Sequence, residues 1–143
     1  MSTHFKKLNE GWNADPNAPD PFVRVTGGRV VLEFTLNAFI FPRFVEEQRG
    51  QLVFSGVSRY RLGPTNDEGW AMGQCRFGHL AAWGEFYEVT GDLLLDQAPG
   101  GWTFVGTPVP AARHFLFYLR DETFECDAER WEFRSSIRRE AGS

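Results

Sequence analysis

Two alternating runs of apolar and polar residues flank a Gly-Gly pair at positions 27 and 28. A tight two-residue hairpin turn needs positive φ angles, which glycine adopts without steric cost. With the turn at these glycines, Val25 pairs with Val30 and Val23 with Leu32. The register gathers six apolar residues on one face: Val23, Val25, Val30, Leu32, Phe34 and Leu36. The segment 22–36 is therefore predicted to be a β-hairpin with one buried face.

The rest of the chain also favours strands, and no segment has the pattern of a helix of three turns. Residues 51–62 and 85–95 are predicted as two long strands, with Gly56 and Gly91 at positions typical of bulges. Shorter strands are expected, at the spacing of a meander, at 102–105, 114–119, 123–127 and 131–133. The predicted class is all-β, with at most one or two short helical turns. A mainly antiparallel meander would form a curled sheet, a barrel or a sandwich.

A chain of 143 residues is long enough for one core and short for two, so we expect one domain. Residues 1–21 are predicted to be an irregular lead-in, because three prolines fall among short polar residues at 13–21. Residues 22–134 then form the β-rich domain and 135–143 a flexible tail. The aromatic share of 15% predicts a core of large flat side chains. Besides the hairpin face, the predicted core includes Phe124, Cys126, Trp131 and Phe133.

The charge and the cysteine content limit which classes of partner and which cellular compartment are expected. A net charge of -4 argues against nucleic acid or an anionic membrane as the partner. No apolar run approaches the roughly 20 residues of a membrane helix, and no signal-peptide stretch follows the first lysines, so a cytoplasmic protein is expected. Two cysteines are too few for a disulfide framework. Cys75 and His79 are one potential ligand pair, but eleven residues separate His114 from Cys126 and no Cys-x-x-Cys or His-x-His pair exists, so no metal or cofactor is expected.

An arginine-rich region is the first candidate site. Arg59 and Arg61 share a face under strict alternation, and Arg76 joins them if the strand after Gly69 pairs antiparallel with 51–62. Guanidinium groups offer a planar fork of donors to a carboxylate or phosphate, and Trp70 would give a stacking wall. The alternative interpretation is an ordinary strand connection beside a half-solvated sheet. The predicted ligand-binding residues are Arg59, Tyr60, Arg61, Trp70, Gln74 and Arg76.

The hairpin within 114–127 is the second candidate. With Asp121-Glu122 as its tip, Tyr118 lies opposite Glu125, either as an acid/base couple or as an ordinary cross-strand hydrogen bond. The ordinary bond is favoured, because the tip lacks a glycine that would define the register. In this hairpin Phe117, Leu119, Phe124 and Cys126 face the core, while the opposite face carries His114, Leu116, Tyr118, Glu125 and Asp127.

The familiar hydrolase, nucleotide-binding and zinc-protease motifs are absent from the sequence. The composition is rich in the residue types of binding hot spots, which favours a binding or interaction module over an enzyme. Such a module would recognise an anionic or polar-aromatic small ligand or a partner protein. One alternative is a small β-barrel enzyme that uses Glu85, Glu88, His79 or the Tyr118 and Glu125 pair. Others are an inhibitor or immunity-type protein that covers a basic toxin, and a structural subunit.

Three segments, 63–70, 83–89 and 113–126, resemble an uncharacterised bacterial protein family of unknown function. The resemblance covers most of the chain. It implies no activity, ligand or catalytic residue, so the function classes above stay open.

Overall fold

The structure is a computed structural model that describes residues 3–63, 84–91, 101–107, 112–119 and 122–135. These residues form ten strands and contain no helix. The strands are β1 (Thr3–Lys7), β2 (Phe22–Thr26), β3 (Arg29–Thr35), β4 (Arg49–Ser55), β5 (Arg59–Gly63), β6 (Phe86–Gly91), β7 (Thr103–Phe104), β8 (Arg113–Tyr118), β9 (Thr123–Ala128) and β10 (Arg130–Ser135).

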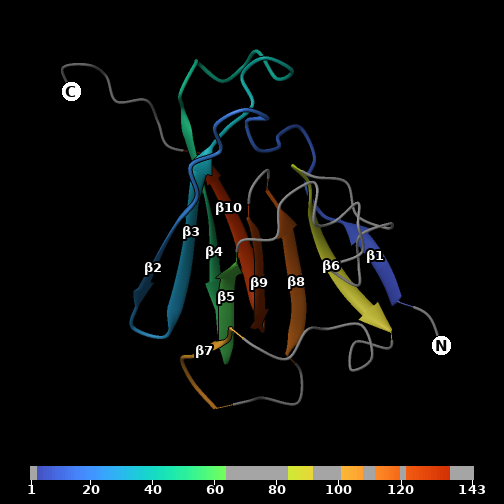
Figure 1. The fold of residues 1–143 in the computed structure, drawn as a ribbon, viewed down its shortest axis with the longest axis vertical. Helices are drawn as coiled ribbons and strands as arrows, with labels where there is room; N and C mark the ends of the chain where they lie inside the picture. The colour runs from blue at the N-terminus through green and yellow to red at the C-terminus, as the bar shows by residue number, and fades with distance from the viewer. Residues whose placement is uncertain (1–2, 64–83, 92–100, 108–111, 120–121, 136–143) are drawn as a thin grey trace.

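The strands form two antiparallel sheets (Figure 1). The larger sheet has the order β1-β6-β8-β9-β5-β7, and the smaller has the order β10-β4-β3-β2. Their apolar faces meet in one core, which contains side chains of both sheets. No strand pairing closes either sheet on itself within the described ranges, so the fold is an open sandwich rather than a barrel. The predicted all-β, antiparallel class is confirmed.

The predicted hairpin is confirmed as β2 and β3. Gly27 and Gly28 have φ angles of 51° and 80°, and Val25 pairs with Val30 as the turn requires. Val30, Leu32, Phe34 and Leu36 are completely buried. The core prediction is wrong for Val25, which is 48% exposed, because β2 is the outermost strand and its turn end is not covered.

The predicted strand 51–62 is wrong as a single element. The chain leaves the smaller sheet after Ser55 and enters the larger sheet at Arg59. Gly56 makes this corner with a φ of 67°, a left-handed conformation that favours glycine. A second corner joins β9 to β10, and the amide of Glu129 there donates to the carbonyl of Ser55 at 3.0 Å. Two adjacent corners therefore connect the sheets.

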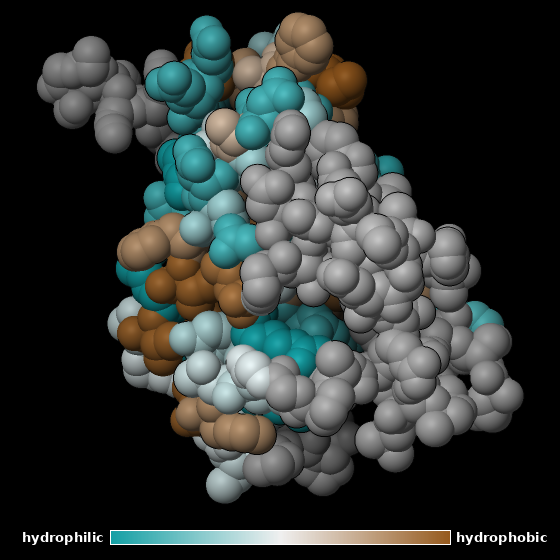
Figure 2. Space-filling model, viewed as in Figure 1, coloured by the Kyte–Doolittle hydropathy of each residue, from teal (hydrophilic) through white to brown (hydrophobic). Residues whose placement is uncertain are grey.

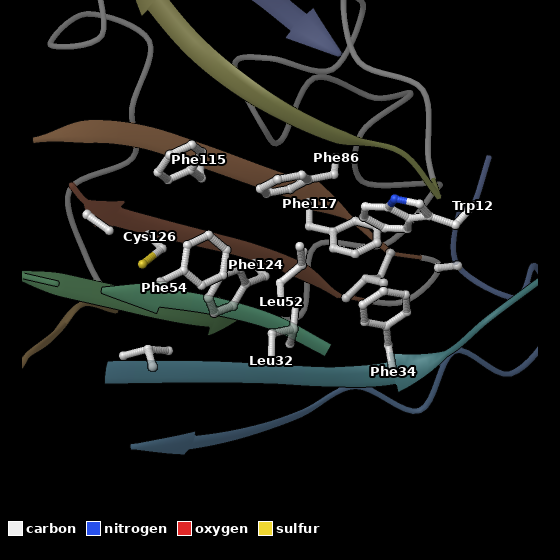
Figure 3. Close-up of a cluster of buried hydrophobic side chains, with 14 of the residues drawn as sticks. Trp12, Leu32, Phe34, Leu52, Phe54, Phe86, Phe115, Phe117, Phe124 and Cys126 are labelled. Atoms are coloured by element: carbon white, nitrogen blue, oxygen red, sulfur yellow. The ribbon is translucent and has the colours of Figure 1, made fainter. Parts of the chain in front are cut away.

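The core is built from aromatic rings of both sheets (Figure 3). Phe86, Phe115 and Phe117 of the larger sheet pack toward Phe34 and Phe54 of the smaller sheet. Several side chains are completely buried, among them Phe34, Phe54, Phe86, Phe115, Phe117 and Phe124. The predicted core residues Val23, Trp131 and Phe133 are partly buried against this cluster.

The N-terminal segment contributes more than the sequence indicated. Within residues 1–21, predicted to be irregular, β1 forms an edge strand beside β6. Trp12 is 4% exposed, and its ring stacks on Phe133 with centroids 4.1 Å apart. Asn9 donates to Glu85 and accepts a 3.0 Å hydrogen bond from the amide of Phe86. The segment therefore covers one end of the sandwich and is held by polar contacts.

The hairpin of β8 and β9 has a different register from the predicted one. Tyr118 pairs with Thr123, and Glu125 lies opposite Leu116. The Tyr118 and Glu125 pair is therefore wrong. The amide of Leu119 donates to the carbonyl of Glu122 at 2.9 Å, so the turn is centred one residue earlier than the tip Asp121-Glu122 assumed, and each residue's partner shifts by two. The faces were predicted correctly, since a shift of two residues keeps each side chain on its side.

Candidate functional site

The outer face of the larger sheet carries a row of charged side chains from three adjacent strands. We call Arg59, Arg61, His114, Glu125 and Asp127 the charged cluster. Arg59 is directly opposite Asp127, and Asp127 is directly opposite His114, so one row crosses β5, β9 and β8. Arg61 and Glu125 lie opposite each other two residues away from Arg59 and Asp127 on the same strands, so alternation places all four side chains on one face. Figure 2 shows hydrophilic atoms over these strands near the middle of the view.

Each charge in the cluster has an opposite charge beside it. The Nδ1 atom of His114 lies 2.5 Å from Asp127 Oδ1, and its Nε2 atom lies 2.9 Å from Glu125 Oε2. Arg59 Nε donates to Asp127 at 2.6 Å, and Arg61 Nε donates to Glu125 at 2.7 Å. A carboxylate oxygen only accepts hydrogen bonds, so both ring nitrogens of His114 must donate. With both acidic groups ionised, His114 makes both contacts only as an imidazolium.

Trp102 lies against this cluster from the segment before β7. The guanidinium carbons of Arg59 and Arg61 are 3.9 Å and 4.1 Å from its ring centroid. The ring of His114 meets it edge-on, with centroids 6.1 Å apart. Cation-π contacts of this kind attract the guanidinium groups to the ring face and hold the indole in position.

Burial and ion pairing oppose each other in the titration of these groups. Burial lowers the pKa of His114, but hydrogen bonds and charge attraction from Asp127 and Glu125 outweigh it, so the pKa lies above its ordinary value. Burial raises the pKa of both carboxyl groups, but His114 together with Arg61 or Arg59 holds each pKa below its ordinary value. The neighbouring charges therefore favour the charged form of each of these three groups against the burial that opposes it.

The predicted arginine site is only partly within the described residues. Arg59 and Arg61 share a face as expected, whereas Tyr60 points to the other face and packs on Phe124. Trp70, Gln74 and Arg76 lie outside the described residues. Residues 69–77 were predicted to pair with the strand 51–62. The part of that strand that forms β4 has no free edge for them, because β4 already lies between β3 and β10.

His114, Glu125 and Asp127 were not predicted to lie beside the arginines. Alternation correctly gave these three residues a common face, but alternation alone does not show that β9 pairs with β5. The contact of Trp102 was missed for the same reason, because β7 joins β5 across about forty residues of chain. A search for charged residues of opposite sign at alternating positions on two strands would have suggested the pairing.

The residues proposed for the enzyme alternative are engaged in other contacts. Glu85 accepts hydrogen bonds from Asn9 and Asn13. Glu88 forms a two-bond ion pair with Arg113, at 3.1 Å and 2.8 Å, which lowers the pKa of Glu88. Both ring nitrogens of His114 are occupied by carboxylates, and His79 is not among the described residues.

A second candidate lies at one end of the sandwich, in the connection from β3 to β4. We call residues 37–48 the apolar loop. Phe39, Ile40 and Val45 are 87%, 61% and 50% exposed. Brown and tan atoms at the top of Figure 2 mark this end of the molecule, where Figure 1 shows the loop. Single exposed apolar residues are ordinary, but three within seven residues form a patch.

The apolar loop is held in its conformation by its own hydrogen bonds. The side-chain oxygen of Asn37 accepts from the amides of Phe39 and Ile40 at 3.1 Å and 3.2 Å. At the other end, the amide of Val45 donates to the side chain of Gln48 at 3.0 Å. Phe44 is buried and anchors the loop on the core. The exposed side chains are therefore presented on an ordered support.

Acidic residues lie within the apolar loop and beside it. A groove of about 520 Å³ runs beside it, with Phe39, Pro42 and Phe44 on one side and with Asp15, Glu46 and Glu47 also in its lining. A second groove of about 550 Å³ shares these three carboxylates and adds Asp20 and Arg49. Two arginines lie nearby: Arg49 pairs with Glu33, whereas Arg43 keeps its positive charge and donates to the neutral carbonyl of Gly11. The groove is thus an acidic surface next to an apolar one.

The fold and these two surfaces define an antiparallel β-sandwich with an internally paired charged face and an exposed apolar end. Comparison of the chain with protein-family models, with curated proteins and with solved structures finds no match. Among the described residues, no group of three or more His, Cys, Asp or Glu side chains is placed to hold a metal ion. The same residues contain no helix that is long and apolar enough to cross a membrane.

Proposed function

We propose that this protein is an interaction module that binds a basic partner protein through the apolar loop and the acidic groove beside it. The observation that carries the proposal is the exposure of Phe39, Ile40 and Val45 on an ordered loop. Burial of large apolar side chains supplies most of the energy at protein interfaces, and an ordered loop loses little conformational entropy on binding.

The charge of the surroundings supports a basic partner. Asp15, Glu46 and Glu47 line the groove beside the loop, and the whole chain carries a net charge of -4. Complementary charge increases the association rate and discriminates against acidic partners. An inhibitor that covers a basic protein is one form of this function. We also propose that this protein is cytoplasmic, which its low cysteine content supports.

Recognition of an anionic small ligand by Arg59 and Arg61 has less support. Both guanidinium groups already form ion pairs, with Asp127 and Glu125 respectively. An anionic ligand would have to compete with these carboxylates for the same donors. The interaction function is therefore favoured over the small-ligand function.

The experiment that tests the proposal compares the double variant Phe39→Ser, Ile40→Ser with the parent protein. Each protein is used to capture partners from a cell extract, and the captured proteins are quantified by mass spectrometry. A partner retained by the parent is then purified and its dissociation constant measured with both proteins. We expect the double variant to bind at least about 30-fold more weakly, the loss of two modest hot-spot residues.

The matched control is Phe104→Ser, because Phe104 is also exposed, at 68%, but belongs to β7. This variant should bind like the parent. Affinity should also fall with added salt, and Glu46→Gln with Glu47→Gln should reduce that salt dependence. Equal binding by the parent and the Phe39 and Ile40 variant, or a purified partner that is acidic, would contradict the proposal.

A further inference from the structure

The outer edge of β2 is a second surface with binding capacity. This strand is the last of the smaller sheet and pairs with β3 only, within the ranges that the structure describes (Figure 1). It contains no proline, lysine or acidic residue between Phe22 and Thr26. Natural edge strands usually carry such residues to prevent unwanted pairing. The sequence Phe-Val-Arg-Val-Thr lacks that protection, apart from Arg24.

The register shows which backbone groups face outward. Thr26 and Arg29 flank a two-residue turn, so they form a hydrogen-bonded pair. Because antiparallel pairs alternate, Arg24 and Phe22 also direct their amide and carbonyl groups toward β3. Val23 and Val25 therefore direct theirs to the open edge. Two donors and two acceptors, regularly spaced, are offered to an added strand.

Apolar side chains accompany these backbone groups. Val23 and Val25 lie on the face that continues the core, and Val25 is 48% exposed. Phe22 on the opposite face is 53% exposed. Brown atoms at the left of Figure 2 lie over β2 and β3. An added strand would therefore bury apolar surface as well as pair its backbone.

Arg24 indicates what kind of strand fits. No ion pair of Arg24 occurs among the described residues. A second copy of β2 that used all four outward groups would place Arg24 opposite the Arg24 of the other copy. Like charges directly opposite one another are destabilising. The edge is therefore less suited to a second copy than to a strand with an acidic residue at that position.

We propose that the outer edge of β2 binds an extended segment of a partner protein by strand addition. The segment has apolar residues opposite Val23 and Val25 and an acidic residue opposite Arg24. Its backbone hydrogen bonds to the two valines supply affinity, and the alternating side chains supply specificity. This surface is separate from the apolar loop, and the proposal does not depend on the function assigned to that loop.

The test uses capped synthetic peptides with the cores Thr-Val-Glu-Val-Thr and Thr-Val-Lys-Val-Thr, added to the full-length protein. Binding is followed by the amide resonances of the protein and by hydrogen exchange. We expect the acidic peptide to shift the amides of Val23 and Val25 and to slow their exchange. The lysine peptide should bind about fivefold more weakly, from the cost of a like-charge cross-strand pair.

Two variants and a control make the test specific. Arg24→Glu should reverse the preference between the peptides, and Val25→Pro should weaken both because it removes an outward N–H group. Arg130→Glu, an exposed arginine on β10 at the other edge of the sheet, should change nothing. Equal affinity for both peptides, no binding at millimolar concentration, or dimerisation through β2 would each overturn the proposal. The Phe39 and Ile40 variant should bind the acidic peptide normally, so this surface is tested separately from the loop.

Discussion

His114 is the residue whose surroundings differ most from those of an ordinary surface histidine. Its side chain is 3% exposed and lies between two carboxylates. Removing one member of a buried ion cluster leaves the others without a counter-charge, which usually costs several kcal/mol. Arg59 and Arg61 still compensate the two carboxylates, so the loss should lie at the lower end of that range. We expect His114→Gln to reduce the free energy of unfolding by about 3 kcal/mol.

The same residue predicts how stability depends on pH. The pKa of His114 is raised above 6.5 in the folded protein, so its contribution is complete below about pH 6.5 and is lost as the pH rises through the folded pKa. The pKa of Glu125 is lowered from 4.5, so its contribution is present above that pH and is lost on acidification. The free energy of unfolding should therefore be largest between these two values.

Urea denaturation from about pH 5 to pH 9 measures this dependence. In the His114→Gln variant the free energy of unfolding should fall much less above pH 6.5 than in the parent. In His4→Gln, a change at an exposed position on β1, it should fall as in the parent. A decline of equal size in the His114 variant and the parent would show that another group titrates.

Among the elements, the corner at Gly56 is the place where one long predicted strand becomes two. A Cβ atom there would lie 2.5 Å from the carboxylate of Glu129, and the φ of 67° is unfavourable for any residue with a side chain. Gly28 has a φ of 80°, but open space surrounds its Cβ position. Alanine must therefore adopt an unfavourable left-handed conformation at both positions, whereas only Gly56→Ala must also displace Glu129.

We expect Gly28→Ala to cost about 1–2 kcal/mol, the penalty for a left-handed alanine, and Gly56→Ala to cost up to about 1 kcal/mol more, because the partly exposed Glu129 side chain must move. The difference between the two midpoints of urea denaturation measures the steric part. Equal costs would mean that the Glu129 side chain moves away without loss, and that the corner depends only on backbone conformation.

For the whole molecule, the core depends on the aromatic rings between the sheets. Phe34 is completely buried and meets Phe117 edge-on, with centroids 5.0 Å apart. We expect Phe34→Ala to cost about 3–5 kcal/mol, as for other buried phenylalanines. Val25→Ala should cost less than about 1 kcal/mol, because Val25 is half exposed. Similar denaturation midpoints for the two variants would show that the sheets do not pack through this face.

Local pattern determined a large part of this fold. The turn at Gly27 and Gly28, the pairing of Val25 with Val30, and the all-β class follow from residues close together in the chain. The reason is that a tight turn sets the register of its two strands, and that alternation with a period of two assigns each side chain to a face.

Only the tertiary structure decided which strands become neighbours. The ion pair of Arg59 with Asp127 joins residues 68 positions apart, and no local pattern specifies that pairing. The two-residue error at Tyr118 has a related origin, since such a shift changes no face and alternation cannot detect it. The change of sheet at Gly56 depends on the core that both sheets share. The charged cluster and the apolar end therefore arise from long-range packing, while the strand faces on which the residues of the charged cluster lie were determined by the sequence alone.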